Sequence, residues 1–268
     1  MRVRGQTIVV TGASSGIGRA TAILLAKKGA TVWAAARNEV RLKELAAEHE
    51  GITPFRCDVA VDEDRASLVE AAGPVDVLVN NAGLGYMGLV EDMDQRDVRN
   101  LFEINVLGLI DLTQRVLPGM LERRHGHITN VASVASFVST PPLTVYSATK
   151  FAVQGFTEGL RREMNGRGIT VAMVNPGPIA TEFGARSLAG PVGTPSTGAH
   201  AGQGLGVGLV AHAIMRTIRY GFVPGYDAIA VPRVMGFTRL GQVPVVDRLI
   251  DLSTLAARPA FRQLRHDH

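Results

Sequence analysis

A glycine-rich turn between a strand and a helix places the strongest constraint on how this chain folds. Residues 6–10 have the composition of a strand, and the helix expected over residues 19–26 has its apolar positions on one face. Gly12, Gly16 and Gly18 lie between them and lack the side chains that would keep backbone amides away from an anion. The helix directs its free N–H groups and the positive end of its dipole at the same point. The stretch therefore predicts a cradle for a pyrophosphate group.

Length and composition favour one large α/β domain around that turn. The chain has 268 residues, of which 46% are hydrophobic, and this is enough to bury a full core. Glycine accounts for 30 residues, so three glycines at a fixed spacing are a weak signal by themselves. The strand before them and the helix after them make the turn informative.

The charge pattern and the single cysteine exclude several classes of protein. The net charge is +4, but the basic residues are scattered and 5% of residues are aromatic, so we expect no nucleic-acid partner. Cys57 can form neither an internal disulfide nor a thiolate metal cluster, which favours a reducing, cytoplasmic location. We interpret His125 and His127 as a solvated turn rather than a metal site. No apolar run approaches the length of a membrane span, so we expect neither an anchor nor export.

Strands and helices alternate along the rest of the chain. Branched and aromatic residues mark the strands, and apolar residues on one helical face mark the helices. Asp62 is the expected N-cap of its helix. Successive β-α-β units of this kind predict an open parallel sheet. The expected strands cover residues 30–35, 52–57, 75–79, 126–131, 169–175 and 229–231, and the expected helices cover 39–48, 62–72, 93–117, 143–164 and 209–220.

Polar residues follow several of the expected strands, at the edge where parallel sheets bind ligands. After the second strand come Ala36 and Arg37, where a carboxylate would suit a free ribose and a basic residue would suit a 2′-phosphate. The alternative is that Arg37 is only an exposed residue at a helix start. Asp58 follows the third strand and can either accept a hydrogen bond from an adenine amino group or cap its own loop. Asn81 and Gly83 follow the fourth, where small residues allow a ring to approach closely.

Four further residues have the chemistry of proton transfer. Tyr146 and Lys150 are four positions apart on an expected helix and so share one face, although such a pair by itself is common on solvated helices. A free tyrosine has a pKa of about 10, and a neighbouring cation can stabilise the phenolate that acid/base work near neutral pH requires. Ser133 follows a strand and can donate to an oxygen that gains charge. Asn105 lies in an apolar helix face, where a buried amide is usually a satisfied core group but is costly enough to suggest a further reason.

In order and spacing these motifs resemble the short-chain dehydrogenase/reductase family. The likeness covers about residues 5–225, and several independent motifs in order are more specific than any one of them. The residues that carry it are Thr11-Gly12-x-x-x-Gly16-Ile17-Gly18, Asn80-Asn81-Ala82-Gly83, Asn105, Ser133, Tyr146-x-x-x-Lys150 and Pro176-Gly177.

The resemblance implies a three-layer, doubly wound Rossmann fold with a seven-stranded parallel sheet, and hydride transfer between a nicotinamide cofactor and a carbonyl or alcohol carbon. Tyr146 would be the general acid/base and Lys150 the neighbour that lowers its pKa and binds the ribose. Ser133 would polarise the carbonyl, and Asn105 would hold a proton-relay water. We also expect a homodimer or homotetramer and, from the single cysteine and the spacing of the histidines, no metal. The implied cofactor-binding residues are Gly12, Ser14, Ser15, Gly16, Ile17, Gly18, Arg37, Asp58, Val59, Asn81, Ala82, Gly83, Tyr146, Lys150, Pro176, Gly177, Ile179 and Thr181.

We therefore expect a single domain over residues 1–268, with a cofactor half at about 1–132, a catalytic and substrate half at about 133–231 and a helical tail at about 232–268. The expected activity is NADP(H)-dependent interconversion of a carbonyl and an alcohol, because Ala36 and Arg37 favour NADP over NAD. No residue of the catalytic set is substituted, which favours an enzyme. The alternatives are a redox-sensing protein that binds NADP without turnover, and a family member that catalyses dehydration or isomerisation.

The expected substrate is a lipophilic small molecule. Residues 134–145 carry no charge, and Leu84, Tyr86 and Met87 add apolar surface after the fourth strand, although Arg186 or His200 could supply charge. Residues 180–208 have little periodicity and indicate a lid or substrate loop. In the tail, Val245, Val246, Leu249 and Ile250 share one helical face, which favours packing on the domain or on a partner subunit over adsorption to a membrane.

Overall fold

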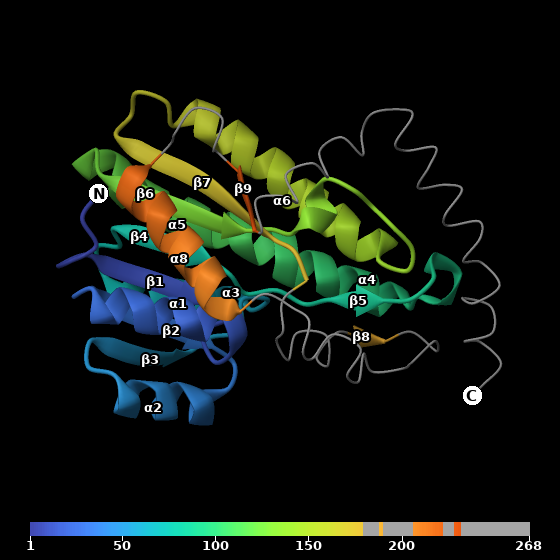
Figure 1. The fold of residues 1–268 in the computed structure, drawn as a ribbon, viewed down its shortest axis with the longest axis horizontal. Coiled ribbons are helices and arrows are strands. Elements are labelled where there is room, and N and C mark those ends of the chain that lie inside the picture. The colour runs from blue at the N-terminus through green and yellow to red at the C-terminus, as the bar shows by residue number, and fades with distance from the viewer. Residues whose placement is uncertain (179–187, 190–205, 222–227, 232–268) are drawn as a thin grey trace.

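A parallel sheet of seven strands forms the centre of the protein (Figure 1). The computed structural model describes residues 1–178, 188–189, 206–221 and 228–231. The strand order is β3-β2-β1-β4-β6-β7-β9, and every pairing within this sheet is parallel. This confirms the predicted fold class and strand number. The strands are β1 (Thr7–Thr11), β2 (Thr31–Ala36), β3 (Ile52–Arg56), β4 (Val77–Asn80), β6 (Gly126–Val131), β7 (Ile169–Pro176) and β9 (Ala228–Val231).

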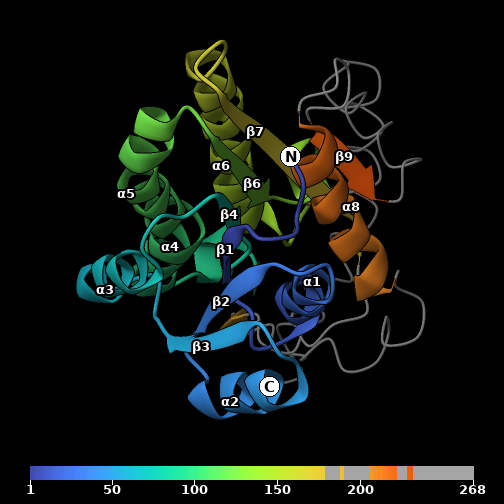
Figure 2. The ribbon, with the colours of Figure 1, turned by 90° about the vertical axis from the view of Figure 1, so that its left-hand side faces the viewer.

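Helices cover both faces of the sheet, as Figure 2 shows. One layer consists of α1 (Gly16–Lys27), α2 (Glu39–Glu48) and α8 (Val207–Tyr220), and the other of α3 (Asp62–Ala72), α4 (Gln95–Phe102), α5 (Gly108–Arg123) and α6 (Thr144–Glu163). Successive strand residues point to opposite faces, so Ile8 and Val10 pack with the α1 layer while Val9 packs with the α3 layer. Burial on both faces explains why the strands are nearly continuous apolar runs.

The order of the strands determines where a ligand can bind. From β1 the chain builds β2 and then β3 on one side, and it returns to place β4 on the other side of β1. The strand order therefore reverses between β1 and β4. Open parallel sheets bind ligands at the carboxyl ends of the strands beside such a reversal. The residues that follow β1 and β4 are the glycine-rich turn and Asn81.

The helix expected over residues 93–117 is interrupted. The π-helical turn Glu103–Leu107 separates α4 from α5, and it contains Asn105. The Asn105 side chain forms hydrogen bonds with both backbone groups of Leu84, in the loop after β4. Such turns insert an extra residue into a helix and are frequent at functional sites. The helix pattern alone could not predict this break, because its polar partner is 21 residues away in sequence.

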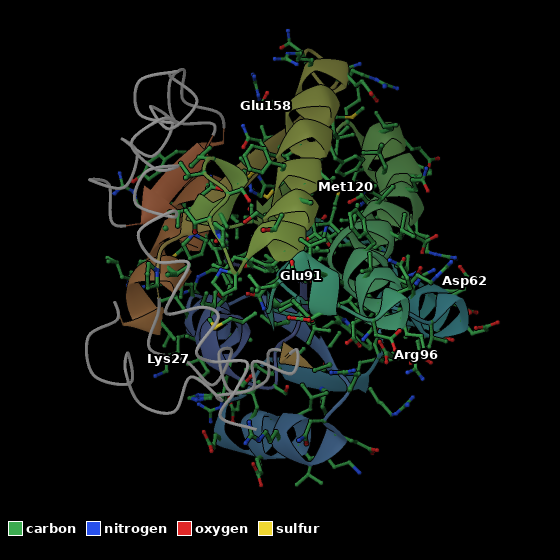
Figure 3. All side chains as sticks on the ribbon, turned by 90° about the vertical axis from the view of Figure 1, so that its right-hand side faces the viewer. Lys27, Asp62, Glu91, Arg96, Met120 and Glu158 are labelled. Carbon is green, nitrogen blue, oxygen red and sulfur yellow. The ribbon has the colours of Figure 1, made fainter. Side chains whose placement is uncertain are left out.

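The prediction that Asp62 caps its helix is wrong. The N-cap of α3 is Val61, which makes no side-chain capping bond, and Asp62 is the first helical residue. Asp62, labelled in Figure 3, instead lies 2.7 Å from Arg115 of α5 and 3.1 Å from Arg65. The side chain of Arg65 is 8% exposed and also pairs with Asp111 of α5 at 2.6 Å. Asp62 therefore helps to join α3 to α5.

The interpretation of His127 as part of a solvated turn is also wrong. His125 is exposed, but His127 lies in β6 and is completely buried. Its ring nitrogens lie 2.7 Å from the hydroxyls of Thr170 and Thr129, and Thr217 of α8 is 2.8 Å from Thr129. Burial lowers the pKa of His127 to about 3. This histidine is therefore a neutral core residue that links β6, β7 and α8.

A second, two-stranded sheet was not expected from the sequence. It pairs β5 (Tyr86–Met87) with β8 (Leu188–Ala189). The structure also has two short 3₁₀ turns, η1 (Val90–Asp92) and η3 (Val134–Ser136). Of the helices that the structure describes, none combines the length and the apolar character needed to cross a membrane.

Candidate active site

The glycine-rich turn packs directly against the chain that leaves β4. Gly12 has φ +67° and Gly16 has φ +53°, in the left-handed region that favours glycine. A Cβ on Gly12 would lie 2.9 Å from both Ala82 Cα and Asn81 Nδ2, and a Cβ on Gly18 would overlap the carbonyl oxygen of Gly12. No acidic residue lies in the first turn of α1 to occupy its positive end. The turn therefore has the shape and polarity of a phosphate cradle, and it includes Ser14, Ser15 and Ile17.

Thr11 fixes this turn to β4, a role that the sequence did not reveal. Its hydroxyl accepts hydrogen bonds from the backbone N–H groups of Asn81 at 3.0 Å and Ala82 at 2.9 Å. The Asn81 side chain in turn donates to the backbone oxygen of Thr11 at 2.9 Å. Because the two segments are about 70 residues apart in sequence, only the pairing of β1 with β4 brings them together.

Arg37 and Asp58 lie beside each other after β2 and β3, where an adenosine would be expected. The distance from Arg37 Nη1 to Asp58 Oδ2 is 3.9 Å, and the Arg37 side chain is 64% exposed. The other carboxylate oxygen of Asp58 accepts a hydrogen bond from the backbone N–H of Ala60 at 3.0 Å. Asp58 thus caps its own loop while one oxygen still faces Arg37. Val59 is buried, and its carbonyl accepts a hydrogen bond from Arg65.

Ser133, Tyr146 and Lys150 converge at the carboxyl end of β6. Ser133 follows β6, whereas Tyr146 and Lys150 project from one face of α6. The Ser133 side chain lies next to the Tyr146 hydroxyl and acts to lower the pKa of Tyr146. Lys150 Nζ lies 5.7 Å from the centre of the Tyr146 ring and donates to the carbonyl of Val131 at 3.3 Å. Tyr146 and Lys150 are buried, so their interactions are little weakened by water.

Asn105 is linked to the helix that carries Tyr146 and to the loop after β4, through Thr149 and Leu84. Its Oδ1 accepts from Leu84 N–H at 2.7 Å, and its Nδ2 donates to Leu84 O at 2.9 Å and to Thr149 Oγ1 at 3.1 Å. Thr149 donates in turn to the backbone carbonyl of Tyr146 at 2.7 Å. Both amide hydrogens of Asn105 therefore bond to groups within the protein. A relay water at this position would have to bind to backbone groups of the π-helical turn. Thr149 was not expected at the site, because its role follows from the position of Asn105.

Burial dominates the electrostatics of Tyr146 and Lys150. It raises the pKa of Tyr146 to about 12, and the hydrogen bond with Ser133 lowers this pKa in part. Burial also lowers the pKa of Lys150 to about 8. The protein groups alone therefore keep the phenol protonated. A bound oxidised nicotinamide would bring a positive ring charge that favours the phenolate.

Asparagines at the ends of neighbouring strands hold α5 and α6 against the sheet. Asn80 Nδ2 donates to Asn130 Oδ1 at 3.0 Å and to Thr113 of α5 at 3.2 Å. Asn130 Nδ2 donates to Thr157 of α6 at 2.9 Å. These residues are buried and hydrogen-bonded across β4 and β6, so the polar groups fix the position of the helix that carries Tyr146.

Some of the remaining predicted site residues lie in the part of the chain that the structure describes, and the others lie outside it. Gly83 lies beside Asn105 and Lys150, because a Cβ there would be 3.4 Å from Asn105 Oδ1 and 3.6 Å from Lys150 Nζ. Pro176 ends β7 and Gly177 follows it. In the part of the chain that the structure describes, no group of histidine, cysteine and carboxylate residues could hold a metal. Outside that part lie Ile179, Thr181, Arg186 and His200, most of the expected lid, and the tail with Val245, Val246, Leu249 and Ile250.

Comparisons with known proteins agree with this geometry. The family model described as short chain dehydrogenase matches residues 6–190. A 3-oxoacyl-[acyl-carrier-protein] reductase of Thermotoga maritima is 38% identical over 189 residues, which cover 68% of this chain and 77% of the relative. Human retinol dehydrogenase 8 is 38% identical over 198 residues, 70% of this chain and 64% of the relative.

Solved structures extend the similarity to complexes with nicotinamide cofactors. A short-chain dehydrogenase/reductase of Burkholderia phymatum in complex with NAD superposes with a TM-score of 0.81 and 27% identity, covering 92% of this chain and 96% of that one. A serine dehydrogenase complexed with NADP+ gives a TM-score of 0.75 and 28% identity, covering 83% and 93%. The chain belongs to the short-chain dehydrogenase/reductase family. It is an oxidoreductase of the class that acts on CH–OH or C=O groups with NAD(P).

Proposed function

We propose that this protein interconverts a ketone or aldehyde and the corresponding alcohol, with NADP(H) as cofactor and a lipophilic small molecule as substrate. The observation that carries the proposal is the placement of Ser133 next to the buried Tyr146 hydroxyl, with buried Lys150 on the same face of α6, at the carboxyl end of β6. A proton donor and a second hydrogen-bond donor next to each other suit one oxygen that changes between carbonyl and hydroxyl.

The roles of the residues follow from their positions. In reduction, a bound reduced nicotinamide would supply the hydride that the carbonyl carbon accepts. Tyr146 gives its proton to the carbonyl oxygen and Ser133 donates a hydrogen bond to the same oxygen, so the developing negative charge is stabilised before the alcohol leaves. The Lys150 ammonium group lies on the same helix face as Tyr146 and stabilises the phenolate that remains. The phenolate then takes up a proton from solvent. In oxidation the same groups act in reverse.

The preference for NADP rests on Arg37 and Ala36. The solved structures described above carry NAD in one case and NADP+ in another, so membership of the family does not fix the cofactor. Arg37 is exposed and can pair with a 2′-phosphate, while alanine at position 36 removes a carboxylate that would repel it. Asp58, 3.9 Å away, competes for the guanidinium and limits the gain.

A lipophilic substrate is supported by fewer surfaces than the sequence suggested. Leu84 and Tyr86 are buried among core residues, so little of their surface is open in this structure. Met87 is 40% exposed, and Val90, which begins the next turn, is 56% exposed. The relatives described above include one named for 3-oxoacyl groups and one named for retinol, which agrees with an apolar substrate.

A turnover screen tests the proposal directly. The absorbance of NADPH is followed with lipophilic ketones and aldehydes and with short carboxylated or phosphorylated carbonyl compounds. We expect steady turnover with the first group and little with the second. Tight cofactor binding without turnover of any substrate would favour a redox sensor, and turnover without change in the nicotinamide would favour dehydration or isomerisation. The mass of the particle in solution tests the expected homodimer or homotetramer.

A further inference from the structure

The direction in which Ser133 donates depends on the turn that follows it. Ser133 is the N-cap of η3, and its Oγ accepts a hydrogen bond from the backbone N–H of Ala135 at 3.1 Å. A hydroxyl has one hydrogen and two lone pairs. Because Ala135 occupies a lone pair, the hydrogen of Ser133 remains free to point at Tyr146 or at a substrate oxygen. Any change in the position of η3 would rotate this donor.

Ser136, at the end of η3, is buried and has two close oxygen neighbours. Its Oγ lies 2.6 Å from the carbonyl oxygen of Ser133 and 3.0 Å from the side-chain oxygen of Asn175 in β7. The single hydrogen of a hydroxyl cannot be donated to both. Asn175 is also completely buried, and its Nδ2 has no partner among the described residues in this orientation.

Both difficulties disappear if the amide of Asn175 is rotated by half a turn, which leaves its shape unchanged. Nδ2 then donates to Ser136 Oγ, and Ser136 donates to the carbonyl of Ser133. The group left over is a carbonyl oxygen, which proteins leave unpaired more often than an N–H. The resulting chain runs from Asn175 through Ser136 to the backbone of Ser133, and it uses the Ser136 hydrogen and one of the two amide hydrogens of Asn175.

This chain joins the catalytic turn to the sheet. The N–H of Ala132 still donates to Val174 of β7 at 2.9 Å, as a continuation of the strand pairing. Beyond Ala132 the backbone leaves the sheet to form η3. Ser136 and Asn175 bring the far end of η3 back to β7, one residue after Val174. The turn is thereby attached to β7 on both sides of Ser133.

We propose that Ser136 and Asn175 are positioning residues that hold Ser133 in the orientation for donating to the substrate oxygen. This rests on the proposed function, in which Ser133 donates to that oxygen. Neither residue touches the reacting atoms in this scheme. Both act through the backbone of Ser133, and their effect should therefore vanish when the Ser133 hydroxyl is absent.

A double-mutant cycle measures this dependence. Removing one oxyanion donor costs about 10²–10³ in kcat, so loosening it should cost less. We expect Ser136→Ala to lower kcat about three- to thirtyfold, with KM and the NADPH dissociation constant changed less than about twofold. Added to Ser133→Ala, the same change should lower kcat by less than about twofold. Asn175→Ala should reproduce this pattern, and Ser136→Cys, which keeps the packing but donates weakly, should lie between wild type and Ser136→Ala.

A second readout separates positioning from packing. Since the bond from Ser133 favours the phenolate of Tyr146, Ser136→Ala should move the pH dependence of alcohol oxidation to higher pH, in the same direction as Ser133→Ala. The matched control is Thr217→Val, which removes a buried hydroxyl from α8 on the other face of the sheet and should leave this profile and kcat unchanged. Equal losses from Ser136→Ala with and without the Ser133 hydroxyl would overturn the proposal alone. An undiminished kcat in Ser133→Ala would overturn the proposed function as well.

Discussion

At the scale of single residues, the hydroxyl of Tyr146 has the most specific expected effect. Tyr146→Phe keeps the buried ring and removes the hydroxyl that lies next to Ser133. Positioned acid/base groups contribute about 10²–10⁴ to the rate, so kcat should fall at least about a hundredfold. The NADPH dissociation constant and the melting temperature should stay close to those of the wild type. A phenylalanine variant with wild-type turnover would show that the proton comes from another group.

Arg37 is the residue at which cofactor choice can be measured. Hydrogen bonds to charged groups contribute about 1.5–3 kcal/mol, so Arg37→Ala should weaken NADP binding about ten- to more than a hundredfold and leave NAD almost unchanged. Replacing Ala36 by Asp in addition should invert the preference. Titrations of both cofactors at one fixed ionic strength measure this, with Arg216→Ala, an exposed arginine of α8, as the matched control. Equal affinities of the wild type for NADP and NAD would contradict the assignment.

The residues of the candidate site were easier to predict from the sequence than the residues that support them. Tyr146 and Lys150 could be paired because helical spacing places them on one face, and the structure does bring them to Ser133. Thr11 and Thr149 could not be recognised, since each acts on a segment that only the sheet or Asn105 brings near. A hydroxyl in a strand or helix carries no local signal of a partner that is distant in sequence.

At the scale of elements, the glycines show how contacts override helix propensity. Gly18 lies in α1, where alanine is ordinarily favoured by about 1 kcal/mol. Here a Cβ would meet the carbonyl oxygen of Gly12 and lie 2.5 Å from Asn81 Nδ2, so the turn would have to move. We expect Gly18→Ala to lower the melting temperature and to weaken NADPH binding at least about tenfold.

The matched control for this change is Gly155→Ala in α6. A Cβ on Gly155 would have no neighbour within 4 Å. This variant should therefore gain up to about 1 kcal/mol of stability and bind NADPH as the wild type does. Thermal unfolding and cofactor titration of the two variants decide the matter. Unchanged NADPH binding in Gly18→Ala would show that the turn tolerates a side chain and does not form a close cradle.

The ends of a helix could be predicted where residues of the helix itself determine them. The helix that carries Tyr146 was expected at residues 143–164 and lies at Thr144–Glu163, because its apolar face is regular. The π-helical turn at Asn105 and the cap of α3 were not predicted. In both cases a side chain, Asn105 or Asp62, is engaged by a distant element rather than by its own helix.

At the scale of the whole molecule, alternation of strands and helices was enough to predict the parallel sheet and its two helical layers. Right-handed crossovers and burial on both faces leave few other arrangements for such a chain. The polar links through the core were beyond this reasoning. His127 illustrates the limit, because β7 and α8 supply partners that are distant in sequence, and its position at the start of an expected strand suggested a solvated turn.

The buried histidine His127 makes the stability of the fold depend on pH in a defined way. An unfolded histidine has a pKa of about 6.5, whereas burial holds the pKa of His127 at about 3 in the native protein. Between these values the unfolded state binds a proton that the native state does not, so this contribution to stability is complete above about pH 6.5 and is lost as the pH falls toward 3. The slope for one proton is about 1.4 kcal/mol per pH unit.

His127→Gln isolates this term, because glutamine can bond to the same hydroxyls but does not titrate. Urea unfolding at pH 5 and pH 7 should show that the free energy of unfolding of the wild type falls by about 2 kcal/mol more than that of the variant. Carboxylates that titrate in the same range affect both proteins equally, so the difference belongs to the histidine. Equal decreases in the two proteins would mean that His127 gains a proton in the native state at ordinary pH and that its site between β6, β7 and α8 admits water.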